Sequence, residues 1–407
     1  MNKIFFLLPL FLSLMLVSHH LPAAAQLTAE EAVARALENH PALRGAHLAV
    51  EEEKGAALQA GLPPNPEVEI GVESWSVSGN RENGMEFLAG VSQPLPLSGA
   101  RRTARRAGLA GAEAAEFEAA SLRREITAEA ERLFYETLVA QQRAEIAGEL
   151  CTREGTLVEL TRKRFELGDL PEVDYMRAAA EHARYQTTLE ETIRDLNALR
   201  ARLAHLCGME ADVLPECAGT VSPTPDTLPE ETVLEDSLLN SPRHQARLLR
   251  ETQASGEADA VRRSAVPEPS LRVGLRRDTR EGSNAVDVGL SVGLPLFDRN
   301  QGALSAARAR TQRIRAENEA AHREEVRQAI ALLHETRRAL ATADHLSGQV
   351  LPKQEASREA LEQALHLGGT TLFEVLAEYR GISETKRALL ESEAQARFAL
   401  IELKALL

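Results

Sequence analysis

Residue types that carry catalytic or metal chemistry are present in this chain, but their spacing does not assemble a reactive site. His322, His334 and His345 are separated by 12 and 11 residues on one expected helix, whereas chelation of a metal by one helix needs histidines about one turn apart. The sequence contains no glycine-rich phosphate loop after a strand and neither of the motifs G-x-S-x-G and H-E-x-x-H. We therefore expect no enzyme activity, no cofactor and no bound metal.

The first 25 residues predict export of the protein. Lys3 provides a basic start, residues 4–17 are almost wholly apolar, and Ala23-Ala24-Ala25 forms an A-x-A cleavage signal. The apolar run is short for a membrane span, so a cleaved signal peptide at 1–25 is favoured over an uncleaved anchor. The mature protein is acidic, because the chain has 61 Asp and Glu against 47 Lys and Arg. This balance argues against a nucleic-acid partner.

Charged residues or glycines alternate with aliphatic residues in four short segments. A period of two predicts a strand with one apolar and one polar face. Two settings fit this pattern: a soluble sheet half buried on a core, or a membrane strand with lipid on one side and a polar lumen on the other. The charged positions that would face such a lumen include Glu67, Glu69, Arg272 and Arg276.

The sequence contains an internal repeat, whose two copies are offset by close to 200 residues. The copies run in the same order and include Asn39-His40-Pro41 with Asn240-Ser241-Pro242, and Leu167-Gly168 with Leu367-Gly368. We therefore divide the chain into a first repeat at 26–220, a proline-rich linker at 221–231 and a second repeat at 232–407. Each repeat is expected to contain a helix, a β-hairpin and a long helical hairpin.

Long helices should make up most of both repeats. One helix is expected from Thr28 to about Ala60, and uninterrupted helices are expected over 100–166 and 301–366, each followed by a short turn and a returning helix. At about 1.5 Å per residue the longest would extend for about 100 Å. Alanine-rich stripes would allow close packing in a wall of curved coiled coils.

Counting the strands favours the membrane setting. Each repeat supplies only two strands, and a lone two-stranded hairpin is barely stable. Four strands cannot close a barrel, whereas three chains would supply twelve. We therefore expect a homotrimer in contact with outer-membrane lipid.

The three cysteines leave an alternative open. Cys207 and Cys217 lie ten residues apart across an expected helix end, and they either form a disulfide in an oxidising compartment or remain free buried thiols. Cys151 lies on a helical stretch, where packing is the expected role.

This duplicated plan resembles the TolC-like outer-membrane efflux proteins. The stretch 164–174 is similar to that family's Arg-aromatic-x-x-Gly turn and the apolar-acid step that follows it, and 367–376 is its second copy. Stretches 92–102 and 293–302 resemble the family's transitions from barrel to helix, most of all in the branch that serves heavy-metal cation efflux. The resemblance covers nearly all of 27–407.

The resemblance implies a fold that is mainly α with a small membrane β part. Duplicated helical hairpins would form a periplasmic α-barrel, and four strands per chain would contribute to a trimeric twelve-stranded outer-membrane β-barrel. The implied function is a passive duct whose partners are a periplasmic adaptor and an inner-membrane transporter of the resistance-nodulation-division (RND) type.

The resemblance also implies roles for particular residues. The adaptor would dock at the turns, which carry Leu167, Gly168, Leu367 and Gly368; glycines there also fit simple helix C-caps. Acids after the second turn would narrow the tunnel mouth. Glu374 occupies the first such position, whereas the second is Ala377, with Glu378 beside it. A solvated carboxylate on a helix face is the alternative for Glu374.

Two other functions remain open at this stage. One is the same duct serving type I protein secretion with an ABC-type transporter. The other is a soluble periplasmic coiled-coil adaptor, which duplication and four alternating strands disfavour. The sequence does not name the exported compound.

Overall fold

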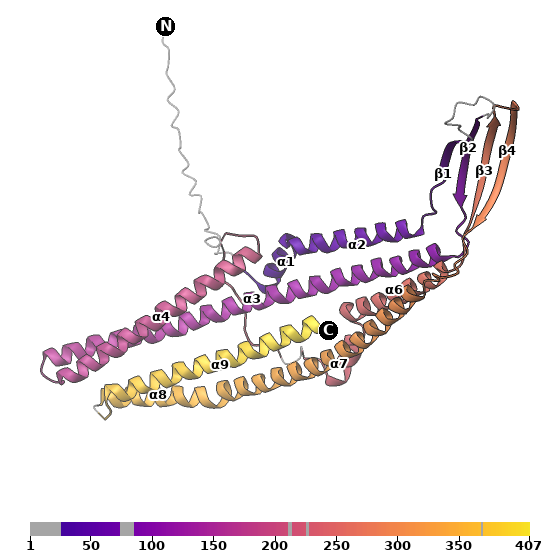
Figure 1. Cartoon of the computed structure of the whole chain (residues 1–407). Helices are drawn as coiled ribbons and strands as arrows, with labels where there is room; N and C mark the ends of the chain where they lie inside the picture. Colours follow the sequence, from indigo (N-terminus) through magenta and orange to yellow (C-terminus); the bar gives the residue numbers. More distant parts are fainter. Residues whose placement is uncertain (1–25, 74–84, 211–213, 225–227, 368) are drawn as a thin grey trace, which may run out of the picture.

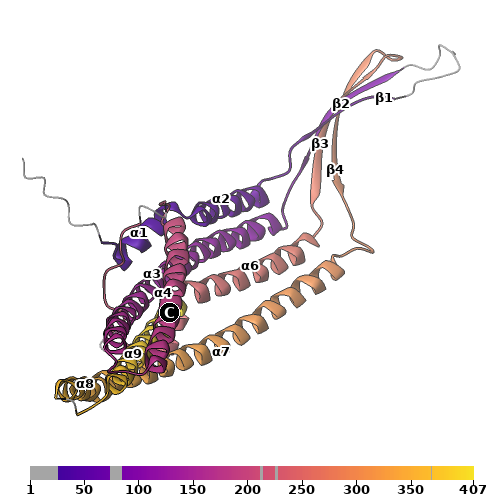
Figure 2. The ribbon, with the colours of Figure 1, turned by 90° about the vertical axis from the view of Figure 1, so that its left-hand side faces the viewer.

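The computed structural model describes residues 26–73, 85–210, 214–224, 228–367 and 369–407. The chain is elongated, with a four-stranded sheet at one end and long helices running away from it (Figures 1 and 2). The strands are β1 (Glu67–Glu73), β2 (Glu86–Pro94), β3 (Pro269–Asp278) and β4 (Ser283–Val292). They form one antiparallel sheet in the order β1-β2-β3-β4, so the two predicted hairpins lie side by side.

Helices continue the sheet in the same order. Four of them pack side by side in the order α2, α3, α6, α7. Of the remaining long helices, α4 returns along α3, and α9 returns along α8 and α7. The bounds of the helices are α1 (Ala29–Asn39), α2 (Pro41–Gly61), α3 (Ala100–Glu166), α4 (Glu172–Leu206), α5 (Glu231–Leu239), α6 (Pro242–Ser264), α7 (Gln301–His345), α8 (Leu351–His366) and α9 (Leu372–Leu406), with a π-helix, η3 (Leu346–Val350), between α7 and α8.

The prediction of a single helix from Thr28 to about Ala60 is wrong. The structure divides it at His40, whose extended backbone (φ −74°, ψ 115°) both ends α1 and caps α2. The cause is Pro41, because a proline disfavours the α conformation of the residue before it. The start of α1 agrees with the sequence, since Thr28 and Glu31 form a capping box.

The prediction of an uninterrupted helix over 301–366 is also wrong. Helix α3 is continuous for 67 residues, but its counterpart contains η3 just before Pro352. A proline inside a helix has no N–H to donate, and its ring clashes with the carbonyl four residues earlier. The helix relieves this conflict by taking one wider π turn.

The core lies near the middle of the molecule, where α1, α3, α4 and α9 meet. The described parts of the proline-rich linker pack on the second repeat. Arg397 of α9 donates hydrogen bonds to the carbonyl oxygens of Val221 and Ser222, each at 2.8 Å. Leu228 contacts the apolar cluster between α5, α7 and α9. Val221 at the start of the linker is also buried in the central core with residues of α3 and α4, so the linker contacts both repeats.

None of the helices in the described ranges carries an apolar stretch long enough to cross a bilayer.

Candidate channel surfaces

One face of the sheet is apolar and exposed. In the register, Ile70 lies opposite Ala89, which lies opposite Leu275 and then Val286. Ile70 is 82% exposed. We call the following residues the apolar strand face: Val68, Ile70, Val72, Phe87, Ala89, Val91, Leu271, Val273, Leu275, Val286, Val288 and Leu290. A continuous apolar patch of this kind marks a surface that another phase or molecule covers.

The opposite face of the sheet carries ion pairs. Arg272 pairs with Glu69, and Arg276 contacts both Asp287 (Nε–Oδ2, 2.9 Å) and Glu86 (Nη1–Oε2, 3.3 Å). We call the following residues the polar strand face: Glu67, Glu69, Glu73, Glu86, Arg272, Arg276, Asp278 and Asp287. The register therefore puts all four predicted charged residues on one face, and it adds Glu73, Glu86, Asp278 and Asp287, which follow the same alternation.

The sheet is open at both sides. In the described part of the chain, β1 pairs only with β2, and β4 pairs only with β3. Unpaired edge strands offer backbone N–H and C=O groups to further strands.

The turn between α3 and α4, which we call the first tip, is a Schellman motif. Gly168 has φ +79°, and its N–H donates to the carbonyl oxygen of Phe165 at 2.9 Å. The N–H of Asp169 donates to the carbonyl oxygen of Arg164 at 2.9 Å. Glycine is needed here because φ is positive. Leu167 beside it is 76% exposed.

The turn between α8 and α9, the second tip, repeats part of this pattern. The N–H of Gly369 donates to the carbonyl oxygen of Ala364 at 2.8 Å, which matches the bond from Asp169 in the first tip. Leu367 is 87% exposed. Gly368 lies outside the described residues. Each tip thus presents an exposed leucine, and a helix C-cap accounts for Gly168.

Glu374 is part of the N-terminal cap of α9. Its carboxylate accepts hydrogen bonds from the backbone N–H of Thr371 at 2.9 Å and from the Thr370 hydroxyl, and the Thr371 side chain accepts from the N–H of Glu374. These bonds, first of all the one from Thr370, lower the pKa of the exposed Glu374 carboxyl from its ordinary value of 4.5. Glu378 is half-buried one turn later.

A buried ion pair joins the two hairpins. Glu154 of α3 is 1% exposed, and its Oε1 accepts from Nε of Arg380 on α9 at 3.1 Å. Arg380 also lies 3.7 Å from Glu181 of α4. Burial raises the pKa of Glu154, and the bond from Arg380 opposes that shift. Sequence reasoning missed this pair, because nothing in either helix indicates that residues 226 positions apart meet.

Comparison with known proteins agrees with this architecture. Residues 32–209 match the family described as outer membrane efflux protein. The chain is 26% identical over 364 residues to the cobalt-zinc-cadmium resistance protein CzcC of Cupriavidus metallidurans, a match that spans 89% of this chain and 86% of CzcC. It is also 26% identical over 255 residues to the nickel-cobalt-cadmium resistance protein NccC of Alcaligenes xylosoxydans, which spans 59% of this chain and 56% of NccC.

The fold is shared with solved channel structures. A crystal structure of CusC superposes with a TM-score of 0.78 at 18% identity, over 93% of this chain and 91% of CusC. Over residues 32–209 the chain is similar to the outer membrane efflux proteins. The family resemblance and the fold class predicted from the sequence are confirmed.

The remaining candidate residues have structural positions. Cys207 and Cys217 are free thiols buried in one apolar cluster, so the structure contains the free-thiol alternative and not the disulfide. Burial raises the pKa of Cys217 to about 12. His322 packs against His244 with ring centroids 5.2 Å apart. Within the described ranges, no group of three His, Cys, Asp or Glu residues could hold a metal ion.

Proposed function

We propose that this chain is the outer-membrane channel of a tripartite efflux pump, exported by its N-terminal segment and extending into the periplasm. The observation that carries the proposal is the sheet, whose exposed apolar face lies back to back with an ion-paired face. Lipid outside and water inside would satisfy both faces at once. A passive duct needs no catalytic group.

Three copies would complete the structure. Pairing β4 of one copy with β1 of the next gives twelve strands and leaves no open edge. Because α2, α3, α6 and α7 follow the strand order, closing the sheet also closes the helices into a tube. A helix of 67 residues gives that tube a length of about 100 Å.

Heavy-metal cations are the proposed cargo. The support is the similarity to proteins named for resistance to cobalt, zinc, cadmium and nickel. The polar strand face has six acids and two arginines, so three copies would line the pore with excess negative charge, which favours cations.

The proposed partners act at the helical tips. A periplasmic adaptor would bind Leu167, Gly168, Leu367 and Gly368 and connect the duct to an inner-membrane RND-type transporter. Three copies of Glu374, with Glu378 beside them, would form an acidic ring at the tunnel mouth.

The membrane assignment is tested by arginine substitutions on the two faces of the sheet. Ile70→Arg and Val288→Arg should each cost about 2–4 kcal/mol near the bilayer midplane. The matched variants Glu69→Ala and Arg272→Ala should leave assembly intact, since exposed ion pairs contribute little. The measurements are trimer yield in outer membranes and conductance in planar bilayers. Equal tolerance on both faces would contradict the barrel.

Docking at the tips is tested by Gly168→Trp. This side chain would strain a positive-φ position and thicken the tip, so metal efflux should fall while trimer abundance stays normal. Unchanged efflux would exclude the first tip as the docking site. If deleting the gene stopped secretion of a protein and left metal resistance unchanged, the duct would serve type I secretion instead. A protein found only in the soluble fraction would instead indicate a periplasmic adaptor.

A further inference from the structure

Exposed apolar side chains continue below the sheet, where the strands meet the helices. Leu294 and Leu296 are 71% and 65% exposed, Phe297 is 91% exposed, and Leu97 in the first repeat is 74% exposed. Leu294 extends the alternation of β4 by one step beyond Val292. The apolar strand face therefore does not end with the last paired residue.

Both repeats make the same turn at this level. The N–H of Leu97 donates to the carbonyl oxygen of Leu95, and the N–H of Leu296 donates to that of Leu294, each at 2.9 Å. A residue with positive φ then starts the helix: Gly99 at +73° before α3 and Asn300 at +57° before α7. The turns thus hold exposed leucines directly beside the first turns of the helices.

Arginines gather just past these leucines. The stretch 97–112 contains four arginines and no acid, although acids outnumber bases in the whole chain. We call the following residues the arginine belt: Arg101, Arg102, Arg105, Arg106, Arg262, Arg263 and Arg299. The acids nearest to them in sequence are Asp259, Glu268 and Asp298, so the belt has an excess of four positive charges.

Most of the belt is unpaired. Arg262 contacts Asp259 at 3.1 Å, and Arg101 donates to the carbonyl oxygen of Leu62. Within the described residues, no carboxylate lies within ion-pair distance of Arg102, Arg105 or Arg106. These three are exposed. Such a group of unpaired cations in an acidic protein points to an anionic partner.

Part of the belt turns away from the neighbouring helices. Gly108 of α3 packs on Ala57 of α2, and Ala107 packs on Gly256 of α6. At 100° per residue, Arg102 and Arg106 lie about 100° or more from both contacts. They are one turn apart and therefore occupy one free face of α3.

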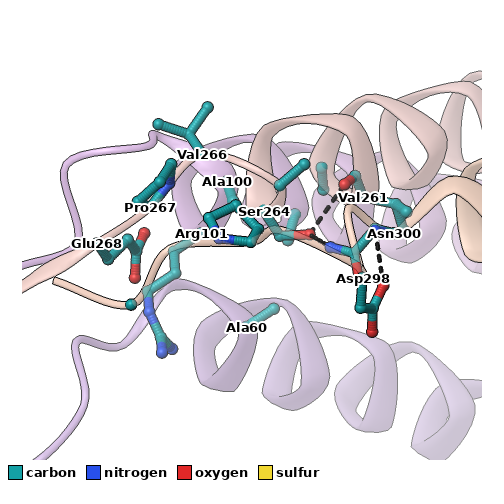
Figure 3. A pocket seen from close by; sticks show the side chains of 15 residues that line it. Ala60, Ala100, Arg101, Val261, Ser264, Val266, Pro267, Glu268, Asp298 and Asn300 are labelled. Atoms are coloured by element: carbon teal, nitrogen blue, oxygen red, sulfur yellow. Dashed lines mark hydrogen bonds between the residues drawn. The ribbon is translucent and has the colours of Figure 1, made fainter.

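A groove of about 600 Å³ lies at the same level, between α2, α3, α6 and the start of α7. Val266 and Pro267 lie toward one end of it, and Asp298 and Asn300 toward the other (Figure 3). Its carboxylates are already occupied: Glu268 accepts from the Ser98 hydroxyl, and Asp298 accepts from the N–H of Asn300. Arg101, which also lines the groove, donates to the carbonyl oxygen of Leu62. In the described part of the chain, Arg102, Arg105 and Arg106, farther along α3, are left without an ion-pair partner.

We propose that this level of the molecule binds anionic phospholipid headgroups of the periplasmic leaflet. The inference rests on the proposed function, since it requires the apolar strand face to lie in lipid. The exposed leucines and Phe297 enter the acyl region, and the arginine belt meets the phosphates one or two helical turns below. Charge complementarity and continuity with the apolar strand face select lipid as the occupant.

The test compares phosphatidylglycerol binding by the assembled protein and by Arg102→Gln/Arg106→Gln. Trimers reconstituted in phosphatidylethanolamine with and without phosphatidylglycerol are re-extracted, and the bound phosphatidylglycerol is measured by mass spectrometry. Each arginine near an anionic surface contributes about fivefold, so the double variant should bind about 25-fold more weakly. Arg102→Lys/Arg106→Lys should restore most of the binding.

Arg184→Gln/Arg323→Gln is the matched control, because both side chains are exposed, at 77% and 82%, and lie on α4 and α7 away from the sheet. It should bind phosphatidylglycerol like the wild type. Equal phosphatidylglycerol binding by the Arg102/Arg106 variant and the wild type, with normal conductance, would contradict lipid binding by the arginine belt. It would not contradict the proposed channel function. Failure of the wild type to enter either membrane would overturn the proposed function itself.

Discussion

The two long helical hairpins follow one plan but differ in the continuity of their first helix. Helix α3 is unbroken, and its residues 146–150 include the buried Leu150. The equivalent positions 200 residues later form η3, which has no buried residue and precedes Pro352. A glycine stands in the middle of both segments, so it does not explain the difference. One proline thus separates a continuous rod from an interrupted one. Duplication has preserved the outline of the hairpin while allowing the continuity of its first helix to differ.

The two tips also differ, and here the second hairpin has the better helix cap. Helix α4 begins after Pro171, whose side chain makes no capping hydrogen bond, whereas α9 begins with the capping box of Thr371 and Glu374. The second hairpin is therefore weaker in its middle and better capped at its tip. Arg380 attaches this hairpin to the first one through its ion pair with Glu154.

The largest effect should come from breaking that attachment. Arg380→Ala leaves Glu154 buried without a cation, and this should cost about 3 kcal/mol in the free energy of unfolding. Chemical denaturation of the purified protein measures it. Arg143→Ala is the control, because Arg143 and Glu391 also join α3 to α9, but at 3.6 Å and with side chains 43% and 53% exposed. Its cost should stay below about 1 kcal/mol. Equal costs would show that the buried pair does not hold the hairpins together.

The interruption itself should be visible in amide exchange. Amides of residues 346–351 should exchange about tenfold faster than those of 146–151, because π geometry and exposure lower the free energy of local opening. Hydrogen–deuterium exchange followed by mass spectrometry measures both segments in one sample. Equal rates would mean that η3 is as rigid as the continuous helix. If the prediction holds, Pro352→Ala should slow amide exchange in 346–351 and leave exchange in 146–151 unchanged.

The difference between the tips should appear on removing each cap. Thr371→Ala deletes the side chain that accepts the N–H of Glu374 and should cost about 1 kcal/mol. Pro171→Ala removes no such bond and should change stability by less than about 0.5 kcal/mol. Thermal unfolding of both variants distinguishes the tips. An equal loss of stability in Pro171→Ala and Thr371→Ala would contradict the proposed difference between the two caps.

Local patterns in the sequence predicted much of this structure. Period-two alternation placed Glu69 and Arg272 on one strand face, and the repeat predicted both hairpins. The break at His40 and the π turn before Pro352 follow from the prolines, which restrict the backbone of the residues before them. Contacts between distant helices were not predictable, because the environment that raises the pKa of Glu154 exists only after α9 has packed against α3 and α4.

The smallest effect concerns the protonation of Glu374. Its pKa is lowered in the single chain by the capping bonds, so its contribution to stability is present above the unfolded pKa and is lost as the pH falls through the folded pKa. Glu374→Gln keeps an acceptor for the N–H of Thr371, and its stability should vary less with pH in the acidic range. The difference in melting temperature between wild type and variant, followed from pH 7 to acid, measures this. Assembly into the proposed trimer would have the opposite influence, since three carboxylates around one axis would raise one another's pKa. The carboxyl pKa of Glu374 in the assembled trimer, compared with that in the single chain, therefore tests the acidic tunnel mouth. A clearly higher value in the trimer supports the ring, whereas an equal value means that Glu374 only caps α9.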